Sequence, residues 1–262
     1  LTFSCQPGEI VGFLGPNGAG KTSTMRMLTG YMPPTAGDAY IAGFHTVNQS
    51  LQARQHLGYL PETVPLYPEM SVEGYLHFMG QVRRLENVWD RVDDVLEAVD
   101  LLDRAESFIG SLSKGMRPRA GTAQALLNDP DVLILDEPTI GLDPAQIVEI
   151  RQIIADVGRQ RTVLLSTHIL AEVEQICSRV IMIIDGRIYA DLPMNQISRD
   201  GSQLSLKLAQ PTEQANEILQ AIAGVTAVSS SSPHQFLLSV DGRDETRMAV
   251  AETAVNHGWG LL

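Results

Sequence analysis

The sequence predicts an α/β fold, a mostly parallel sheet flanked by helices with a helical insertion, followed by a small α+β domain. Short apolar runs bounded by Gly, Pro and Asp alternate with helix-length segments, which is typical of a parallel sheet covered on both faces. A glycine-rich segment, residues 15–22, directly follows the first apolar run. Towards the C-terminus the strands and helices become shorter. We therefore expect two domains, 1–197 and 203–262, joined by the hydrophilic segment 198–203.

The first domain is predicted from buried strands and the helices that follow them. The apolar run 9–14 predicts the first strand, and a helix follows over 21–29. Asp143 and Pro144 are typical of the cap and first turn of a helix, expected to end near residue 158. Further elements are expected as strands over 38–41, 132–135 and 163–165, a helix over 169–176, and a hairpin with an Asp-Gly turn over 183–188.

A helical insertion is expected over about residues 64–128. Ser71 is a suitable N-cap, and Val88, Val92 and Val95 recur with helical spacing. No strand pattern interrupts this stretch, so we expect it to form a helical subdomain within the first domain.

The second domain has the pattern β-α-β-β-α-β, which is the order of a ferredoxin-like fold. Its last strand is expected to begin at Trp259 and to be truncated by the end of the chain. The other predicted elements are strand 204–208, helix 212–223, strands 225–228 and 236–240, and helix 244–257.

The composition is globular with an acidic balance. Lys and Arg number 19 against 31 Asp and Glu, a formal net charge of −12, whereas proteins that grip nucleic-acid backbones usually carry the opposite sign. No apolar run approaches the ~18 residues that a membrane-spanning helix needs. No signal peptide is recognisable. We therefore expect a cytosolic protein without a nucleic-acid partner, whose role at a membrane comes through another protein.

The two cysteines, Cys5 and Cys177, have no CxxC partner. Idle thiols in a reducing compartment are the expected state, and a disulfide stays open as the alternative. The chain begins with Leu1 rather than Met, so we expect a fragment or a trimmed chain.

Residues 15–22, Gly-Pro-Asn-Gly-Ala-Gly-Lys-Thr, fit the pattern GxxxxGK[ST] between a predicted strand and a predicted helix. The glycines let backbone N–H groups turn inward around a phosphate. Lys21 is expected to neutralise β- and γ-phosphate oxygens, and the Thr22 hydroxyl to bind Mg²⁺. The segment therefore predicts a phosphate-binding loop for a nucleotide.

Two carboxylates, Asp136 and Glu137, end the strand predicted over 132–135. In an open parallel sheet, ligands bind outside the carboxyl ends of the strands. Two acids after a strand are more often a solvated helix cap, but the phosphate-binding loop favours a role at the ligand. Asp136 is expected to reach the Mg²⁺ of the nucleotide, and Glu137 to polarise a water that attacks the γ-phosphate.

The segment 112–116, Leu-Ser-Lys-Gly-Met, resembles the signature motif of the ATPases of ABC transporters. Segment 59–62, Tyr-Leu-Pro-Glu, is similar to that of bacterial gliding-motility and multidrug-type ABC exporters. The resemblance covers residues 1 to about 195 and implies a P-loop NTPase fold of ABC type. The motifs also follow that family's order: phosphate-binding loop, helical insertion, signature, Asp136-Glu137, Gly141-Leu142-Asp143 and Ser166-Thr167-His168.

The resemblance implies an ATP-binding and ATP-hydrolysing subunit that drives a separate membrane permease. The segments 59–62 and 112–116 favour a transporter of export type. It implies a head-to-tail homodimer with two ATP molecules, each between the phosphate-binding loop of one subunit and the signature of the other. Such a protein lies on the cytoplasmic face of the cell membrane, bound through the permease. Residues near Glu62 and the insertion 64–110 would form the groove that receives a cytoplasmic helix of the permease.

The site residues follow from the motifs and from the resemblance. Ser113 and the Gly115 amide would bind γ-phosphate oxygens from across the dimer interface. Lys21, Glu137 and His168 are the expected catalytic residues, His168 holding the attacking water, and Asp143 would couple the two sites. The expected metal ligands are Thr22, Glu62 and Asp136. The residues expected to bind ATP are Gly15, Pro16, Asn17, Gly18, Ala19, Gly20, Lys21, Thr22, Ser23, Ser113, Lys114, Gly115, Met116 and Asp143.

Four features depart from the family's pattern. Glu62 stands where Gln is usual, a change that similar exporters share. Pro118 stands inside the helix that the signature begins and predicts a slight distortion there. Ile140 replaces the usual Ser. The aromatic residue that stacks on adenine is expected upstream of Leu1.

Two other functions stay open. An ABC ATPase of DNA repair or of the ribosome usually carries a coiled-coil or zinc insertion or a second ATPase domain, and none is recognisable in this sequence. The second alternative is a regulatory module that binds nucleotide without hydrolysing it. The presence of Lys21 and Glu137 argues against this alternative, and Pro118 in the signature helix keeps it open. The transported substrate is not encoded in these motifs, because substrate choice lies in the membrane partner.

Overall fold

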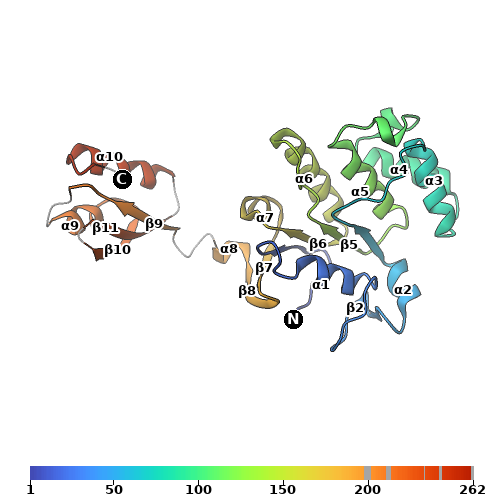
Figure 1. Cartoon of the computed structure of the whole chain (residues 1–262), viewed down its shortest axis with the longest axis horizontal. Helices are drawn as coiled ribbons and strands as arrows, with labels where there is room; N and C mark the ends of the chain where they lie inside the picture. Colours follow the sequence, from blue (N-terminus) through green and yellow to red (C-terminus); the bar gives the residue numbers. More distant parts are fainter. Residues whose placement is uncertain (198–201, 211–213, 233, 242–243, 261–262) are drawn as a thin grey trace. The chain divides into compact units, whose positions relative to one another are not determined.

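Six strands form the central sheet of the N-terminal part of the chain, and four of their pairings are parallel (Figure 1). The computed structural model describes residues 1–197, 202–210, 214–232, 234–241 and 244–260. The sheet has the order β4-β5-β6-β1-β7-β8. Its strands are β1 (Ile10–Leu14), β4 (Leu57–Leu60), β5 (Val132–Asp136), β6 (Thr162–Thr167), β7 (Arg179–Ile184) and β8 (Arg187–Pro193). The predicted mostly parallel sheet is confirmed.

The chain divides into two units, Leu1–Leu192 and Pro193–Leu262. The domain ranges expected from the sequence, 1–197 and 203–262, stay predictions. Most of the expected linker, residues 198–201, lies outside the described residues. Its last two positions do not act as linker, because strand β9 already begins at Ser202.

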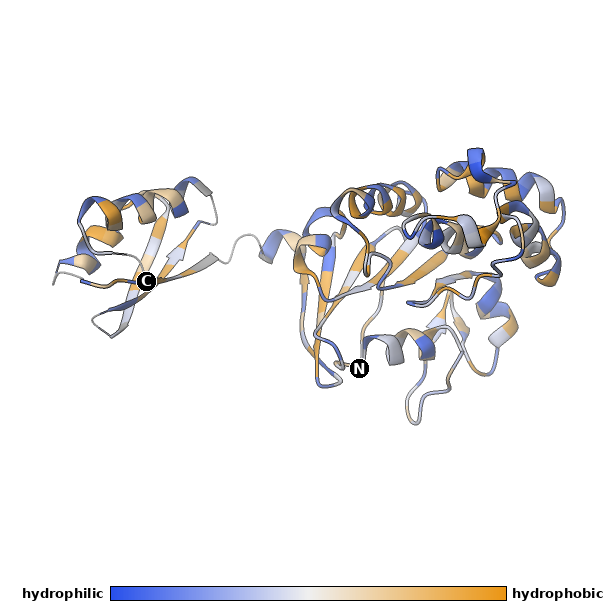
Figure 2. Cartoon of the chain, turned by 45° about the horizontal axis from the view of Figure 1, so that its top comes forward, coloured by the Kyte–Doolittle hydropathy of each residue, from blue (hydrophilic) through white to orange (hydrophobic). Residues whose placement is uncertain are grey.

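The side chains of β1 alternate between two helical layers. Val11 and Phe13 are fully buried and belong to one apolar cluster with Met25 of α1 (Lys21–Leu28). On the other face, a Cβ at Gly12 would lie 2.6 Å from a methyl of Val173 in α7 (Leu170–Ile176). Figure 2 shows the strands of the sheet as largely hydrophobic between helices with hydrophilic outer sides. Both faces of β1 are therefore covered, and the small Gly12 lets α7 approach the sheet closely.

Helix α6 (Pro144–Gly158) begins as its sequence predicts. The Asp143 carboxylate accepts a hydrogen bond of 3.0 Å from the Gln146 N–H, and Pro144 is the first helical residue. Asp143 and Pro144 thus fix the start of the helix that follows the Asp136-Glu137 pair.

The insertion between β4 and β5 is helical, as expected. Ser71 caps α3 (Val72–Val82) by accepting a hydrogen bond of 3.1 Å from the Gly74 N–H. Helix α4 (Val88–Ala98) buries Val92, Val95 and Leu96. Two 3₁₀ turns, η1 (Leu102–Arg104) and η2 (Ile109–Ser111), lead to α5 (Met116–Leu126).

Pro118 does not interrupt α5. It is the third residue of the helix, where a backbone N–H has no partner within the helix in any case. The Thr122 hydroxyl donates to the Pro118 carbonyl at 2.9 Å, and the helix continues to Leu126. The helix is therefore not broken at Pro118, and the slight distortion expected from the sequence stays a prediction.

Several short elements differ from the prediction, and the strand expected over 38–41 covers only Tyr40–Ile41. Strand β4 and helix α2 (Ser50–Gln55) were not expected, and β2 (Tyr40–Ile41) pairs with an unexpected β3 (Phe44–His45). Strand β4 has only four residues and includes Gly58, whose added Cβ would lie 2.3 Å from the Ala125 carbonyl oxygen. Its pairing with the distant β5 stabilises it rather than its own composition.

The C-terminal unit contains a three-stranded antiparallel sheet of order β10-β11-β9. Phe236, Leu238 and Val240 alternate along β11 and are buried with Leu219 and Trp259. The elements are α8 (Met194–Ile197), β9 (Ser202–Lys207), α9 (Ala215–Gln220), β10 (Val225–Ser232), β11 (Gln235–Val240) and α10 (Asp244–Asn256).

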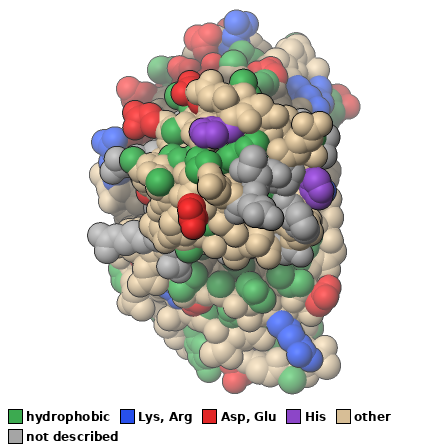
Figure 3. All heavy atoms as spheres, turned by 90° about the vertical axis from the view of Figure 1, so that its left-hand side faces the viewer, with side chains coloured by type: hydrophobic (Ala, Val, Ile, Leu, Met, Phe, Trp, Pro, Cys, Tyr) green, Lys and Arg blue, Asp and Glu red, His purple; other side chains and the backbone are tan. Residues whose placement is uncertain are grey.

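The ferredoxin-like description of this unit stays a prediction, because its expected last strand continues into residues 261–262, outside the described residues. On the face shown in Figure 3, hydrophobic, acidic and basic side chains are mixed, and the basic ones stand singly. Among the described residues of the whole chain, no helix is both long and apolar enough to span a bilayer.

Candidate functional site

The loop between β1 and α1 is shaped by glycines. A Cβ at Gly15 would lie 2.3 Å from the Ile183 carbonyl oxygen, so only glycine fits there. Gly18 and Gly20 have φ angles of +81° and +103°, which side chains other than glycine rarely tolerate. Helix α1 then begins at Lys21 with no acidic residue in its first turn. The N-terminus of this helix is therefore available to an anion.

Lys21 folds back over this loop. Its ammonium group donates to the carbonyl oxygens of Gly15 at 2.8 Å and Pro16 at 3.2 Å. It also lies 3.1 Å from Oε1 of Glu137, and both side chains are almost fully buried. The loop thus holds one buried cation against two of its own carbonyl oxygens.

Asp136, at the carboxyl end of β5, has one oxygen bonded and one without a partner. Its Oδ1 accepts hydrogen bonds from the hydroxyls of Ser166 at 2.5 Å and Thr22 at 3.4 Å. Its Oδ2 is buried and has no hydrogen-bond partner among the described residues. A buried carboxylate oxygen without a partner, next to a threonine hydroxyl, fits an oxygen-ligated divalent cation such as Mg²⁺.

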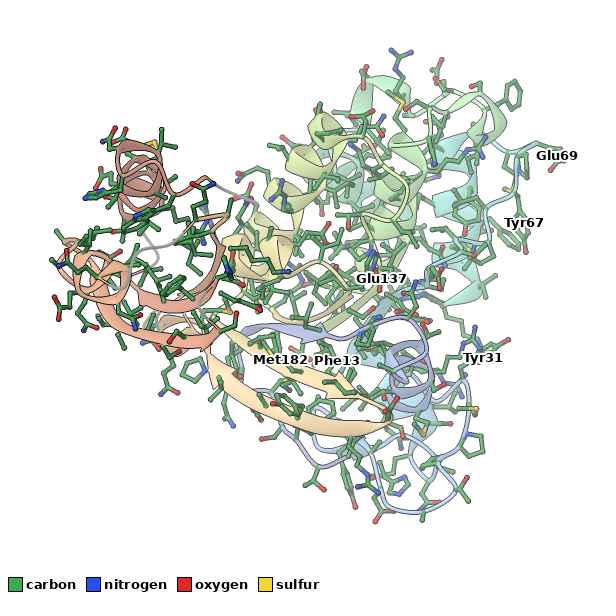
Figure 4. The ribbon with its side chains drawn as sticks, turned by 60° about the vertical axis from the view of Figure 1, so that its left-hand side comes forward. Phe13, Tyr31, Tyr67, Glu69, Glu137 and Met182 are labelled. Atoms are coloured by element: carbon green, nitrogen blue, oxygen red, sulfur yellow. The ribbon has the colours of Figure 1, made fainter. Side chains whose placement is uncertain are left out.

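Glu137 lies between a lysine and a histidine. Its Oε1 faces Lys21, and its Oε2 lies 2.9 Å from Nδ1 of His168, which follows β6. The backbone has a φ of +49°, a strained conformation for this residue type. Its N–H donates to the Ser166 carbonyl oxygen at 3.1 Å and so maintains that conformation. Figure 4 shows Glu137 in the interior of the unit, above Phe13 in that view.

Two buried residues of this site had no role in the sequence prediction. Ser166 binds both Asp136 and the backbone of Glu137. Glu172 accepts hydrogen bonds of 2.6 Å from the hydroxyls of Thr139 and Thr167, and so ties together the segments after β5 and at the end of β6. Ser166 belongs to the predicted segment Ser166-Thr167-His168 but had no role assigned to it. Glu172 resembles any charged residue of a helix in the sequence.

The segment 112–116 lies at the start of α5 and is more exposed. The Ser113 hydroxyl accepts from the Met116 N–H at 3.3 Å, and Ser113 and Lys114 are exposed. A Cβ at Gly115 would lie 2.5 Å from the Gln146 side chain of α6. Ser113, Gly115 and Met116 border a hollow of about 320 Å³ together with Gln146. Within the described ranges, no hydrogen bond or ion pair joins the segment to Lys21 or Asp136.

Glu62 and Asp143 are also exposed and lie outside the buried cluster. Among the residues that the structure describes, Glu62 forms no hydrogen bond or ion pair, and the carboxylate of Asp143 caps α6. Burial, and next the negative charge of Asp136, raise the pKa of Tyr59 to about 12, with a smaller contribution from Glu62. The carboxylates of Asp136 and Glu62 therefore both raise the pKa of the Tyr59 hydroxyl. Glu62 nevertheless forms no hydrogen bond with Thr22, another expected metal ligand.

A glycine loop between a strand and a helix, with a lysine, a threonine and an aspartate at the carboxyl ends of parallel strands, defines the class of P-loop nucleotide-binding proteins. Residues 1–140 match the family described as ABC transporter. The chain belongs to this family.

Similar proteins include bacterial transporter subunits. The chain is 43% identical over 191 residues to the ABC transporter ATP-binding protein YhcH of Bacillus subtilis, covering 72% of this chain and 62% of that protein. It is 41% identical over 194 residues to the Nod factor export ATP-binding protein I of Burkholderia pseudomallei, covering 73% and 64%. The chain therefore spans less than two thirds of the length of these relatives.

A solved structure, cbiO1 from Clostridium perfringens, described as part of the ABC transporter complex cbiONQ, has a similar fold. Its TM-score is 0.69 at 25% identity, covering 75% of this chain and 82% of that one. The predicted P-loop fold of ABC type is confirmed.

Proposed function

We propose that this chain is the ATP-binding and ATP-hydrolysing subunit of an ABC transporter, of export type, that works with a separate membrane permease. The single observation that carries the proposal is the buried ion pair of Lys21 and Glu137 beside the phosphate-binding loop, with the exposed His168 in contact with the same carboxylate. A module that only binds nucleotide has no need of a buried, strained carboxylate at this place. Relatives named as ATP-binding proteins of transporters support the same function.

In this proposal the phosphates of ATP lie in the loop 15–23, against its backbone N–H groups and the start of α1. Lys21 exchanges its ion pair with Glu137 for the β- and γ-phosphate oxygens. The freed Glu137 carboxylate then accepts a proton from the attacking water, and the His168 imidazole orients that water through its contact with Glu137.

Thr22 and Asp136 would hold Mg²⁺, since Asp136 has a buried oxygen without a partner. The ion would supply positive charge to the phosphate oxygens as charge develops on them. We propose Glu62 as a further ligand through its carboxylate, which requires movement of the loop after β4. The described residues contain no group of three or more His, Cys, Asp or Glu placed to hold a metal, which agrees with an ion bound largely by nucleotide and water.

We propose a head-to-tail homodimer in which Ser113, Lys114, Gly115 and Met116 of one subunit face the nucleotide of the other. The exposure of Ser113 and Lys114 supports this arrangement, as does their position at the start of a helix. The exposed Asp143 then couples the two sites across the interface.

The permease partner is proposed to bind in a groove between the core and the helical insertion. Of the residues expected to form such a groove, Glu62 does not line it, and the insertion contributes residues 82–85 and Asn128. This insertion groove has a volume of about 1070 Å³ and is bordered by residues that follow α1, by α2 and by the end of α3. The similar cbiO1 is described as part of a transporter complex. The protein would thus lie on the cytoplasmic face of the cell membrane, attached through its partner.

Calorimetric titration with Mg-ATP tests the proposal. Lys21→Ala is expected to abolish ATP binding or weaken it by about 100-fold, since it removes the buried cation of the loop. The matched control is Lys207→Ala on the exposed surface of β9, which should bind as the parent does. An unchanged affinity in Lys21→Ala would refute the assignment of the loop.

A further inference from the structure

The insertion groove combines basic and apolar side chains and has no acidic ones. Arg54 of α2, and Arg83 and Arg84 at the end of α3, line it, and no Asp or Glu is among its lining residues. The chain as a whole has 31 acidic residues against 19 basic ones. The groove is therefore positively charged, whereas the chain as a whole has a negative net charge.

None of these arginines forms an ion pair within the described part of the chain. Arg54 donates to the carbonyl and hydroxyl oxygens of Ser50, and Arg83 donates to the amide oxygen of Asn128. Burial lowers the pKa of Arg83 below its ordinary value, and no carboxylate opposes that shift. A partly buried cation with only a neutral partner is costly for the isolated protein.

Arg84 occupies a position that favours glycine. The N–H of Leu85 donates to the Gly80 carbonyl at 3.1 Å, and the N–H of Arg84 donates to the Gln81 carbonyl at 2.9 Å. These two bonds form a Schellman motif that ends α3, with Arg84 at the left-handed position, φ +57°. An arginine there is strained where a glycine would not be. Its side chain is exposed and forms no hydrogen bond or ion pair to any described residue.

Three large apolar side chains complete the groove. Tyr31 is 78% exposed, Leu51 73% and Val82 60%, and all three line the groove. Figure 4 shows Tyr31 projecting outward from the segment after α1. Such exposure of neighbouring apolar groups, bordered by charged ones, is typical of a surface that a partner covers.

We infer that the permease segment bound in this groove is an acidic amphipathic helix, with apolar side chains on Tyr31, Leu51 and Val82 and carboxylates on Arg83 and Arg84. Arg54, which lines the groove from α2, would receive a further acid from the same helix. The carboxylates would provide the missing counter-charge of Arg83 and give a use to the strained Arg84. This inference rests on the proposed function, in which a permease docks here.

Two synthetic amphipathic peptides with blocked ends test the inference. Both have the same Leu and Ala face; one carries Glu at the flanking positions and the other Lys. Fluorescence anisotropy with the full chain should show binding of the Glu peptide, weakening with salt, and at least about tenfold weaker binding of the Lys peptide. Arg83→Gln, which keeps a hydrogen-bond donor for Asn128, should weaken binding of the Glu peptide about tenfold.

Arg84→Gly separates a role in binding from a role in structure. It removes the backbone strain, so the thermal midpoint should rise while affinity for the Glu peptide falls. Arg84→Lys should keep most of the affinity. Arg159→Gln, which removes an exposed arginine at the C-cap of α6 and outside the groove, is the matched control and should change neither.

Equal binding of the two peptides, or an unchanged affinity in Arg83→Gln and Arg84→Gly, would overturn the inference. Binding of phosphatidylglycerol vesicles in place of the Glu peptide would do the same, because it would assign the arginines to lipid phosphate. If Mg-ATP binds the parent chain while the Glu peptide does not, the inference fails and the proposed function stands. If Mg-ATP does not bind, the proposed function itself fails.

Discussion

The two surfaces proposed to contact ATP are the phosphate-binding loop and the signature segment. They differ in how deeply their polar side chains are buried and in how many hydrogen bonds these side chains form within the chain. Around the phosphate-binding loop, Lys21, Asp136 and Glu137 are buried; Lys21 pairs with Glu137, and both acidic residues are bonded to Ser166 of β6. At the signature segment, Ser113 and Lys114 are exposed, and the Ser113 hydroxyl accepts only a bond from the start of its own helix.

This difference indicates which half of the proposed ATP site, the phosphate-binding loop or the signature segment, is preorganised by the fold of a single chain. Buried hydrogen bonds and ion pairs fix side chains before a ligand arrives, because an unpaired buried polar group is costly. Exposed groups at a helix start carry no such constraint and are available to a second molecule. The first half should therefore function by itself in binding, and the second only after assembly.

The largest expected effect concerns the preorganised half. Glu137→Gln should lower ATP turnover by roughly 10²–10⁴ while ATP binding is kept, because the amide cannot accept the proton of the attacking water. Steady-state phosphate release and calorimetry measure the two properties. Glu174→Gln, an exposed acid of α7, is the matched control and should turn over normally. Normal turnover in Glu137→Gln would move the base elsewhere, with His168 as the next candidate.

Mixing two inactive variants tests whether the halves come from different subunits. Lys21→Ala disables the first half and Ser113→Arg the second, so each variant alone has only defective sites. In an equal mixture, about a quarter of the parent ATPase activity should return, since half the dimers are mixed and each has one intact site of two. The recovered activity should rise with protein concentration. A Ser113→Arg protein as active as the parent, or full activity in a species that light scattering shows to be monomeric, would contradict the model of a shared site.

A smaller effect concerns the scaffold of the signature half. Pro118→Ala should change the free energy of unfolding by less than about 1 kcal/mol, because the third helical residue needs no N–H partner. Ala123→Pro, farther inside the same helix, should cost about 3 kcal/mol or more. Urea unfolding followed by circular dichroism compares them. A loss of several kcal/mol on Pro118→Ala would mean that the proline itself holds the helix start.

The smallest effect concerns the hairpin that supports the phosphate-binding loop, where the Gly186 N–H donates to the Ala19 carbonyl at 3.0 Å. Arg179 donates hydrogen bonds of 2.6 and 2.7 Å to the Asp191 carboxylate, which hold its pKa below the ordinary value of 3.8. The pair therefore stabilises the fold above that pH, and the contribution is lost as the pH falls through the lowered pKa.

Asp191→Asn should lower stability at neutral pH by at most about 1 kcal/mol, because the pair is partly exposed. At acidic pH, the difference from the parent should shrink. Thermal unfolding at a series of pH values measures it, and a constant difference from neutral to strongly acidic pH would contradict the role of this pair.

Much of the molecule follows from local patterns. The phosphate-binding loop, the caps at Ser71 and Asp143, and the Asp185-Gly186 turn depend on residues within a few positions of one another, so their sequence predicts them. Asp136 and Glu137 could be placed at a ligand site because they directly follow a predicted strand. The carboxyl ends of the strands in a parallel sheet meet at one edge, where ligands bind.

What only the tertiary structure decided are pairings between distant residues. Strand β4 exists because it pairs with β5 across the whole insertion, and Ser166 and Glu172 gained their roles by meeting partners about 30 residues away. The unpaired arginines of the insertion groove belong to the same group, because a sequence does not show which of 31 acids lies near a given arginine. By itself the sequence determined the chemistry of the loop and the class of fold. Charge pairing, backbone strain at Arg84 and burial of Glu137 depend on long-range packing, and that packing is set only when the whole chain folds.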